Sequence, residues 1–144
     1  MDMSYGEKSA WVSLLTMGAA YAWYFSKYGP ALAAGELVFG DIFGALIGLV
    51  ILIVIVEVIL HVALGLDIAR SGADAEVTGD ERDALIEVRA NIISSYVLGA
   101  GAITGIFCAA LQTPVVTAHV LLLSLVAAET VKLVTQLVYY RRGI

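Results

Sequence analysis

The sequence predicts an all-α fold, a four-helix transmembrane bundle in which residues 1–144 form a single integral-membrane domain. Four apolar runs fill most of the chain, and each reaches the roughly 20 residues that a helix needs to cross a lipid bilayer. Hydrophobic residues make up 60% of the sequence and the mean hydropathy is +0.91, whereas hydrophobic residues form roughly half of a soluble domain. The runs are continuous rather than alternating, which favours helices over the strands of a membrane barrel.

The first span is expected at about residues 9–28. Trp11 lies near one end of this segment, and Trp23, Tyr24 and Tyr28 lie near the other. Amphipathic rings favour the headgroup region at the two membrane surfaces, so this pattern is typical of an anchored helix. A signal peptide is the weaker interpretation, because the segment lacks the positively charged amino end that signal peptides carry.

The second span is expected at about residues 37–66, after Pro30, which should end the first helix. This run is longer than a bilayer requires, so we expect the helix to tilt or to begin in the interface. The only substantial polar loop follows at about residues 67–90, and it leads into a third span at about residues 91–111.

A helix start is predicted inside that loop. Thr78 and Glu81 have the spacing of a capping box, in which each side chain accepts a bond from an unpaired backbone N–H. Asp80, Glu81 and Asp83, with Arg82 among them, fall in the first turn, where carboxylates suit the positive end of the helix dipole. We therefore expect this helix to begin in water and to continue into the third span.

The fourth span is expected at about residues 115–140. It follows the short turn Gln112-Thr113-Pro114, in which Thr113 is a plausible helix cap and Pro114 suits the first helical position. Because the turn is so short, the third and fourth spans must be antiparallel neighbours.

Orientation is predicted from the basic residues, which are enriched in the cytoplasmic loops of membrane proteins. The connections after the first and third spans contain only Lys27, whereas the opposite side carries Lys8, Arg70, Arg82, Arg89, Arg141 and Arg142. Both termini and the polar loop should therefore be cytoplasmic.

Charge and motif content argue against several classes of function. A net charge of −5 and a pI near 4.8 argue against nucleic-acid binding, which needs a basic face. The single cysteine, Cys108, cannot form an internal disulfide. The chain also lacks a nucleophile next to a base, a paired-cysteine motif and a Gly-rich phosphate loop, so we do not expect an enzyme.

Small residues recur at helical spacing and predict close helix packing. In lipid the hydrophobic effect does not drive helices together, and small side chains instead let backbones approach. The second span carries one such stripe, Gly40, Gly44 and Gly48, which could pack against another helix of the chain or form a homodimer contact. The third span carries another, Gly101 and Gly105.

Four ionisable residues inside the spans are the principal functional lead. Glu57 and Glu129 should lie at one depth, with His61 and Lys132 about one turn nearer the cytoplasm. An ionisable group inside a membrane segment is costly and is a site by default. A supporting polar layer is predicted from the other spans and the same helix face: Ser13, Thr16, Ser94 and Gln136.

This ionisable layer has three interpretations. The first is an ion-pair network that fixes helix register, whose contribution to stability is modest because desolvation offsets attraction. The second is a proton or ion site for transport or sensing, because two carboxylates against one ammonium leave a charge of −1 that a proton would neutralise. The third interpretation is a zinc or iron site on Glu57, His61 and Glu129, although their spacing differs from that of di-iron bundles.

His119 stands apart from this layer, in the outer half of the fourth span. We expect its ring to bond a backbone carbonyl, a water molecule or Asp41.

Several segments of the sequence carry a family resemblance. They are Glu7-Lys8-Ser9-Ala10-Trp11-Val12, Asp80-Glu81-Arg82-Asp83-Ala84-Leu85-Ile86-Glu87 with the later Tyr96-Val97-Leu98-Gly99, Ala128-Glu129, and Tyr139-Tyr140-Arg141-Arg142-Gly143. In these segments the chain resembles a family of short, uncharacterised bacterial four-span inner-membrane proteins with an Asp-Glu-Arg-Asp/Glu loop. The resemblance implies a bacterial inner-membrane location and four helices, and it implies no activity.

Two hypotheses from different classes follow from the sequence. The first is a transport or sensing bundle in the lipid bilayer, centred on Glu57 and Glu129. The second is a membrane-anchored interaction protein that contacts a cytosolic protein partner through residues 78–90, the most distinctive part of the resemblance.

Overall fold

The computed structural model describes residues 4–70 and 81–142. This part of the chain consists of four helices and contains no strand: α1 (Tyr5–Ala33), α2 (Phe39–Arg70), α3 (Glu81–Ala110) and α4 (Pro114–Arg142). The predicted all-α four-helix bundle is therefore confirmed. Thr78 and Asp80 of the predicted capping box lie outside the described residues, but α3 does begin at Glu81 and continues without a break through the third apolar run.

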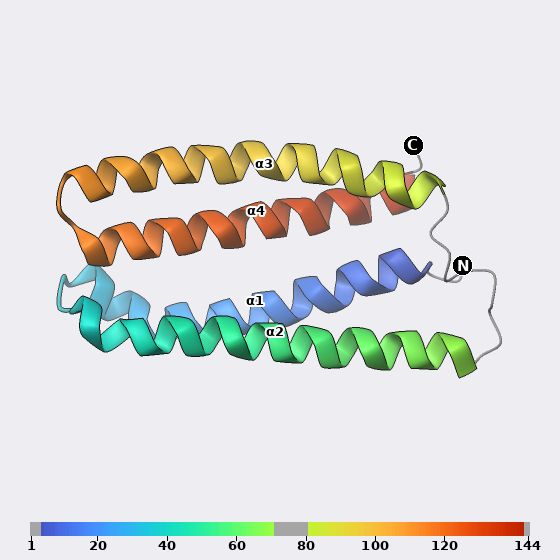
Figure 1. The fold of residues 1–144 in the computed structure, drawn as a ribbon, viewed down its shortest axis with the longest axis horizontal. Helices are drawn as coiled ribbons and strands as arrows, with labels where there is room; N and C mark the ends of the chain where they lie inside the picture. The colour runs from blue at the N-terminus through green and yellow to red at the C-terminus, as the bar shows by residue number, and fades with distance from the viewer. Residues whose placement is uncertain (1–3, 71–80, 143–144) are drawn as a thin grey trace.

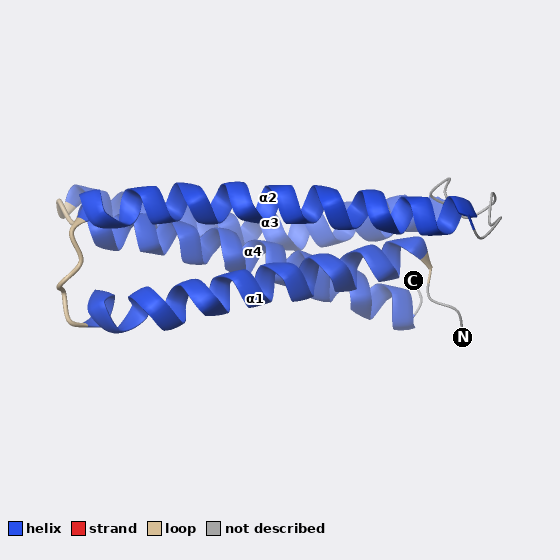
Figure 2. Cartoon of the chain, turned by 90° about the horizontal axis from the view of Figure 1, so that it is seen from below, coloured by secondary structure: helices blue, strands red, loops and turns tan. Residues whose placement is uncertain are grey.

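The helices are antiparallel neighbours in the order α3, α4, α1, α2 (Figure 1). Extensive contacts join α3 to α4, α4 to α1 and α1 to α2. Figure 2 shows the same four helices from a second direction, with α2 near the top of the view and α1 near the bottom. Two helices begin and two end at one end of the bundle, which we call the termini end; the connections between α1 and α2 and between α3 and α4 lie at the opposite, hairpin end.

Helix α1 is longer than predicted at both ends. The Ser4 side chain accepts a bond from the Glu7 N–H at 3.2 Å, which caps the first turn. The prediction that Pro30 ends the helix is wrong, because α1 continues to Ala33. Three residues after Pro30 complete the last turn, and the helix ends where Gly35 adopts a positive φ of 70°.

Both connections at the hairpin end close with the same backbone pattern. After α1, Gly35 N–H donates to the Leu32 carbonyl and Glu36 N–H donates to the Ala31 carbonyl. This paired arrangement is a Schellman motif, in which a left-handed residue satisfies the last carbonyls of a helix. After α3, Gln112 takes that role with a φ of 56°. Pro114 then opens α4, as predicted.

Three helices are long and apolar enough to cross a membrane, namely Ile42–Leu66 within α2, and α3 and α4 over their whole lengths. This result indicates a membrane protein. Helix α1 has 29 residues but is not among the three. Its stretch between Lys8 and Lys27 contains no charged residue, but several serine, tyrosine and tryptophan side chains there lower its mean hydropathy. Membrane crossing by α1 therefore stays a prediction.

Small residues mark the closest helix contact. A Cβ atom added at Gly101 would overlap the Ser124 side chain on α4, and one added at Gly105 would lie 2.5 Å from Leu121 Cδ2. Glycine is thus needed where α3 meets α4. In contrast, Cβ atoms added at the α2 glycines would meet nothing within 4 Å: Gly40, Gly44 and Gly48. The α2 stripe therefore faces away from the other described helices.

Candidate functional site

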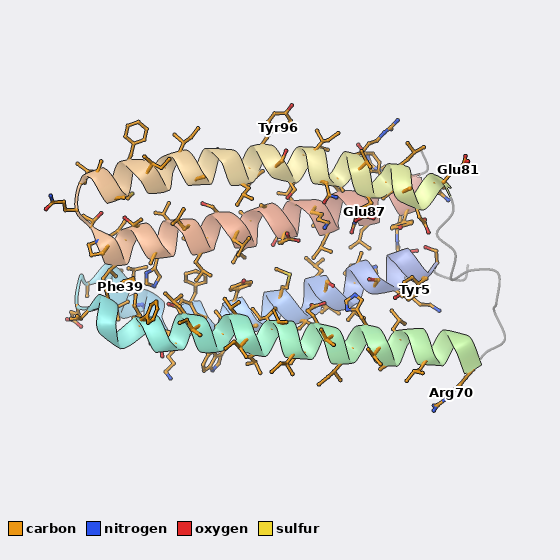
Figure 3. The ribbon with its side chains drawn as sticks, viewed as in Figure 1. Tyr5, Phe39, Arg70, Glu81, Glu87 and Tyr96 are labelled. Atoms are coloured by element: carbon orange, nitrogen blue, oxygen red, sulfur yellow. The ribbon has the colours of Figure 1, made fainter. Side chains whose placement is uncertain are left out.

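A cavity of about 510 Å³ occupies the half of the bundle nearer the termini end. Along α1 its lining extends from Tyr5 to Met17, which is about 18 Å at the 1.5 Å rise of an α-helix. Tyr5 and Glu87, both of which line the cavity, lie toward that end in Figure 3. All four helices contribute lining residues, and a volume of this size is typical of small-ligand sites.

Glu57 on α2 is held against α1 by a hydroxyl. Ser13 Oγ donates to Glu57 Oε2 at 2.8 Å, and His61 Nδ1 lies 3.3 Å from the same oxygen. His61 is one helical turn further along α2, which places the two side chains on one face. Sequence analysis assigned Glu57 and His61 to the ionisable layer and Ser13 to the polar residues that support it.

His61 connects the pair to a second hydroxyl on α1. Its Nδ1 lies 2.8 Å from the Glu57 backbone carbonyl, and its Nε2 lies 2.8 Å from Ser9 Oγ. In the neutral ring with the proton on Nδ1, Nδ1–H donates to that carbonyl and Nε2 accepts from Ser9. A protonated ring would instead donate from Nε2 to Ser9. Ser9, His61, Glu57 and Ser13 therefore form one continuous polar chain between α1 and α2.

The second carboxylate oxygen of Glu57 has no partner. Glu57 Oε1 is buried and makes no hydrogen bond to any described residue, whereas the Glu57 side chain as a whole is only 20% exposed. Buried polar atoms in native proteins nearly always have a partner, and an exception calls for an explanation such as a bound ion or proton. Because Glu57 lines the cavity, this oxygen is the main chemical feature of the site.

Helix α4 adds the remaining members of the predicted layer. Glu129, Lys132 and Gln136 line the same cavity as Glu57. In the described part of the chain, ion pairs within 4 Å join Glu57 to His61 and Glu7 to Arg141. The i,i+3 pair of Glu129 and Lys132 that an ion-pair network would contain is not among them.

Three predicted residues are not part of the cavity wall. His61 contacts the lining residues Glu57 and Ser9 but does not itself line the cavity. Thr16 on α1 does not line the cavity either, and Ser94 on α3 is buried without reaching it. A shared depth in the bundle therefore does not place Thr16 or Ser94 at the site, because each helix turns only part of its circumference inward.

Two further carboxylates come from the start of α3. Asp83 and Glu87 line the cavity together with Glu57 and Glu129. If all are ionised, four carboxylates against one ammonium, that of Lys132, leave a formal charge of −3. Sequence analysis assigned Asp83 to the loop and did not include Glu87; their i,i+4 spacing on one helix face was the signal available.

The termini end of the bundle joins three segments that are far apart in the sequence. Arg82 Nη2 donates to the carbonyls of Tyr139 and Tyr140 at 3.5 and 3.4 Å, which satisfies acceptors at the end of α4. Arg141 Nε donates to Glu7 Oε1 at 3.0 Å. The starts of α1 and α3 are thus both fastened to the last turns of α4.

Metal ligation by the predicted set is not supported by the geometry. Across residues 4–70 and 81–142 no three His, Cys, Asp or Glu side chains lie close enough together to hold a metal ion. Glu57 and His61 are in contact, but Glu129 does not complete a triad with them. The predicted zinc or iron site therefore lacks its third ligand in this arrangement.

His119 forms a separate polar contact near the hairpin end. His119 Nδ1 lies 2.8 Å from the Val115 carbonyl, and Nε2 lies 3.2 Å from the Tyr24 hydroxyl. The expected bond to a backbone carbonyl is present, and the Asp41 side chain is outside what the structure describes. Tyr24 and His119 are 0% and 2% exposed, so this pair belongs to the core.

Comparison with protein-family models, with curated proteins and with solved structures finds no match to this chain.

Proposed function

We propose that this protein is a transport or sensing bundle that binds a proton or a cation in its acidic cavity. The observation that supports the proposal most directly is Glu57, which lines a cavity of about 510 Å³ and whose buried Oε1 has no partner among residues 4–70 and 81–142. A proton on that oxygen would turn it into a donor, and a cation beside it would balance its charge. Either event would reduce the cost of a buried charge whose second oxygen has no partner among the described residues.

The charge of the cavity favours a positive ligand. Glu57, Asp83, Glu87 and Glu129 face a single ammonium, that of Lys132. Like charges held together in a low-dielectric region repel, and a bound cation or proton lowers that energy. An ion-pair network, the ordinary interpretation of such residues, would instead pair opposite charges one to one.

The polar chain from Ser9 through His61 and Glu57 to Ser13 suits a proton. Each member can donate or accept, and successive atoms are 2.8 to 3.3 Å apart. Histidine changes its charge near neutral pH more readily than any other side chain. Both hydroxyls of this polar chain, those of Ser9 and Ser13, belong to α1. Binding of a proton or cation at Glu57 would therefore change the contacts between α2 and α1.

The alternative is a membrane-anchored interaction protein acting through its polar loop. Two residues of the loop motif have partners within the chain: Arg82 bonds the end of α4, and Asp83 lines the cavity. These contacts favour a role of the motif in closing the bundle. Glu81 is exposed, and a cytosolic partner would have to use it with the residues before it.

We further propose that the termini end is cytoplasmic and that the membrane is a bacterial inner membrane. The first part rests on the basic residues, because Lys8, Arg70, Arg82, Arg141 and Arg142 belong to helix ends at the termini end, whereas Lys27 is near the hairpin end. Such an excess is typical of cytoplasmic segments. The second part rests on the family resemblance.

Cation-driven proton release tests the proposed function. Purified protein in mild detergent and weak buffer would be titrated with sodium, potassium and tetraethylammonium chloride while an indicator dye records pH. We expect a saturable release of protons with at least one cation, lost in Glu57→Gln and in Glu129→Gln. The matched control is Glu36→Gln, which removes an exposed carboxylate outside the cavity. No release with any cation, or equal release from all four proteins, would reject the proposal.

A further inference from the structure

The Tyr140 side chain lines the part of the cavity nearest the termini end and lies against α1. Tyr140 belongs to the last turn of α4, and its hydroxyl lies against Gly6 in the first turn of α1. A Cβ atom added at Gly6 would overlap that hydroxyl. Both residues line the cavity at the termini end. Glycine at position 6 therefore leaves the space that the tyrosine ring occupies.

Contacts from α3 hold Tyr140 in this place. The Asp83 side chain lines the same end of the cavity as Tyr140, and Arg82 binds the Tyr140 backbone carbonyl at 3.4 Å. The neighbouring pair of Arg141 and Glu7 fixes α4 to α1 at 3.0 Å. The ring is thus positioned by the starts of two helices, and each of these contacts is polar and close to a helix end, where local opening is least costly.

From this arrangement we propose that Tyr140 is the gate residue of the cavity, which controls access from the termini end to Glu57 and Glu129. The inference rests on the proposed function only for the identity of the ligand that enters. The gate itself concerns access to the cavity and can be tested with any small cation. Opening requires the Tyr140 ring to move away from Gly6 and from the cavity wall that Asp83 shares. Asp83 then becomes the first carboxylate that a positive ligand would meet, so displacement of the tyrosine by the ligand is coupled to entry.

Thiol accessibility tests the gate without requiring knowledge of the ligand. The parent protein would be Cys108→Ala with Ser13→Cys, a single thiol in the cavity wall beside Glu57. Its modification by the cationic reagent 2-(trimethylammonium)ethyl methanethiosulfonate would be followed by mass spectrometry. We expect Tyr140→Ala to raise the modification rate at least about tenfold. Gly6→Ala, which displaces the ring from the α1 side, should raise it in the same direction and serves if Tyr140→Ala does not fold.

The matched control is Tyr139→Ala, which removes the adjacent ring from outside the cavity wall and should leave the rate within about twofold of the parent. Rates unchanged by both Tyr140→Ala and Gly6→Ala would overturn the proposal and place the entrance elsewhere, for example at the lipid-facing side. No modification even with Tyr140→Ala would overturn it as well. The thiol assay measures only access to the cavity. A negative thiol result therefore does not reject the proposed cation site, and a negative cation titration does not reject the proposed gate.

Discussion

Replacing Glu57 by glutamine should make the protein more stable while removing its proposed activity. The carboxylate is 20% exposed, accepts one bond from Ser13 at 2.8 Å, lies 3.3 Å from His61 and leaves Oε1 unpaired. Glutamine keeps an oxygen for Ser13 and removes the buried charge. The two interpretations of this residue therefore predict opposite signs for the change in the free energy of unfolding.

The magnitude follows from the contacts. A hydrogen bond to a charged acceptor contributes about 1.5 to 3 kcal/mol and a neutral one about 0.5 to 1.5 kcal/mol, so the change weakens the Ser13 bond by about 1 kcal/mol. Burying an ion costs several kcal/mol, and the single bond from Ser13 with the nearby His61 ring offsets only part of that cost. We expect Glu57→Gln to raise the free energy of unfolding by about 1 to 2 kcal/mol, as is common when a strained site is neutralised.

The assay is equilibrium unfolding at pH 8 in mixed micelles of dodecyl maltoside with increasing dodecyl sulfate, followed by far-ultraviolet circular dichroism. The comparison variant is Glu7→Gln, which removes a carboxylate with a salt-bridge partner, Arg141, that is 64% exposed. That change should lower stability by about 0.5 to 1 kcal/mol, the range of exposed pairs. A loss of more than about 1 kcal/mol in Glu57→Gln would refute the reasoning, because the charge would then be holding α1 against α2 as an ion-pair network requires.

Two further predictions concern the packing of the bundle. Tyr24→Phe keeps the buried ring but leaves the Nε2 of His119, which is 2% exposed, without its 3.2 Å partner; we expect a loss of about 1 to 2 kcal/mol in the same unfolding assay, and no change beyond that of Tyr28→Phe would contradict this role. Gly101→Ala should cost about 1 to 3 kcal/mol through overlap with Ser124, whereas Gly44→Ala, with open space around it, should gain up to about 1 kcal/mol. A wild-type dimer that Gly44→Leu converts to a monomer in light scattering would assign the α2 glycine stripe to a homodimer interface.

The sequence was sufficient to predict the helices and part of the site. Continuous apolar runs require helices in lipid, and the short turn at Gln112 to Pro114 leaves α3 and α4 no arrangement except an antiparallel pair. Helical phase also placed Glu57 beside His61. The end of α1 was not predictable from Pro30, because a proline so near the last turn removes few backbone bonds and Gly35 offers a better end.

The parts of the site that could not be predicted depend on the rotation of each helix about its axis and on the angles at which the helices cross. Phase shows that Asp83 and Glu87 share a face of α3, but only the packing of α3 on α4 turns that face toward Glu57. Likewise Gly6 and Tyr140 are 134 residues apart, and no periodicity relates them. Ser4 and Glu7 had the spacing of a helix start, a signal present in the sequence that pointed to the true beginning of α1.

The hydroxyl face of α1 has a consequence for how the protein is made. Ser9 and Ser13 satisfy His61 and Glu57 of α2, and α1 is not among the three helices long and apolar enough to span a membrane. If each helix partitioned into lipid on its own, α1 would remain in the aqueous channel of the translocon. Helix α2 would then enter lipid with its ionisable groups unpaired. Biogenesis should therefore favour entry of α1 and α2 as a preformed hairpin, with α1 retained near the translocon until its partner has been synthesised.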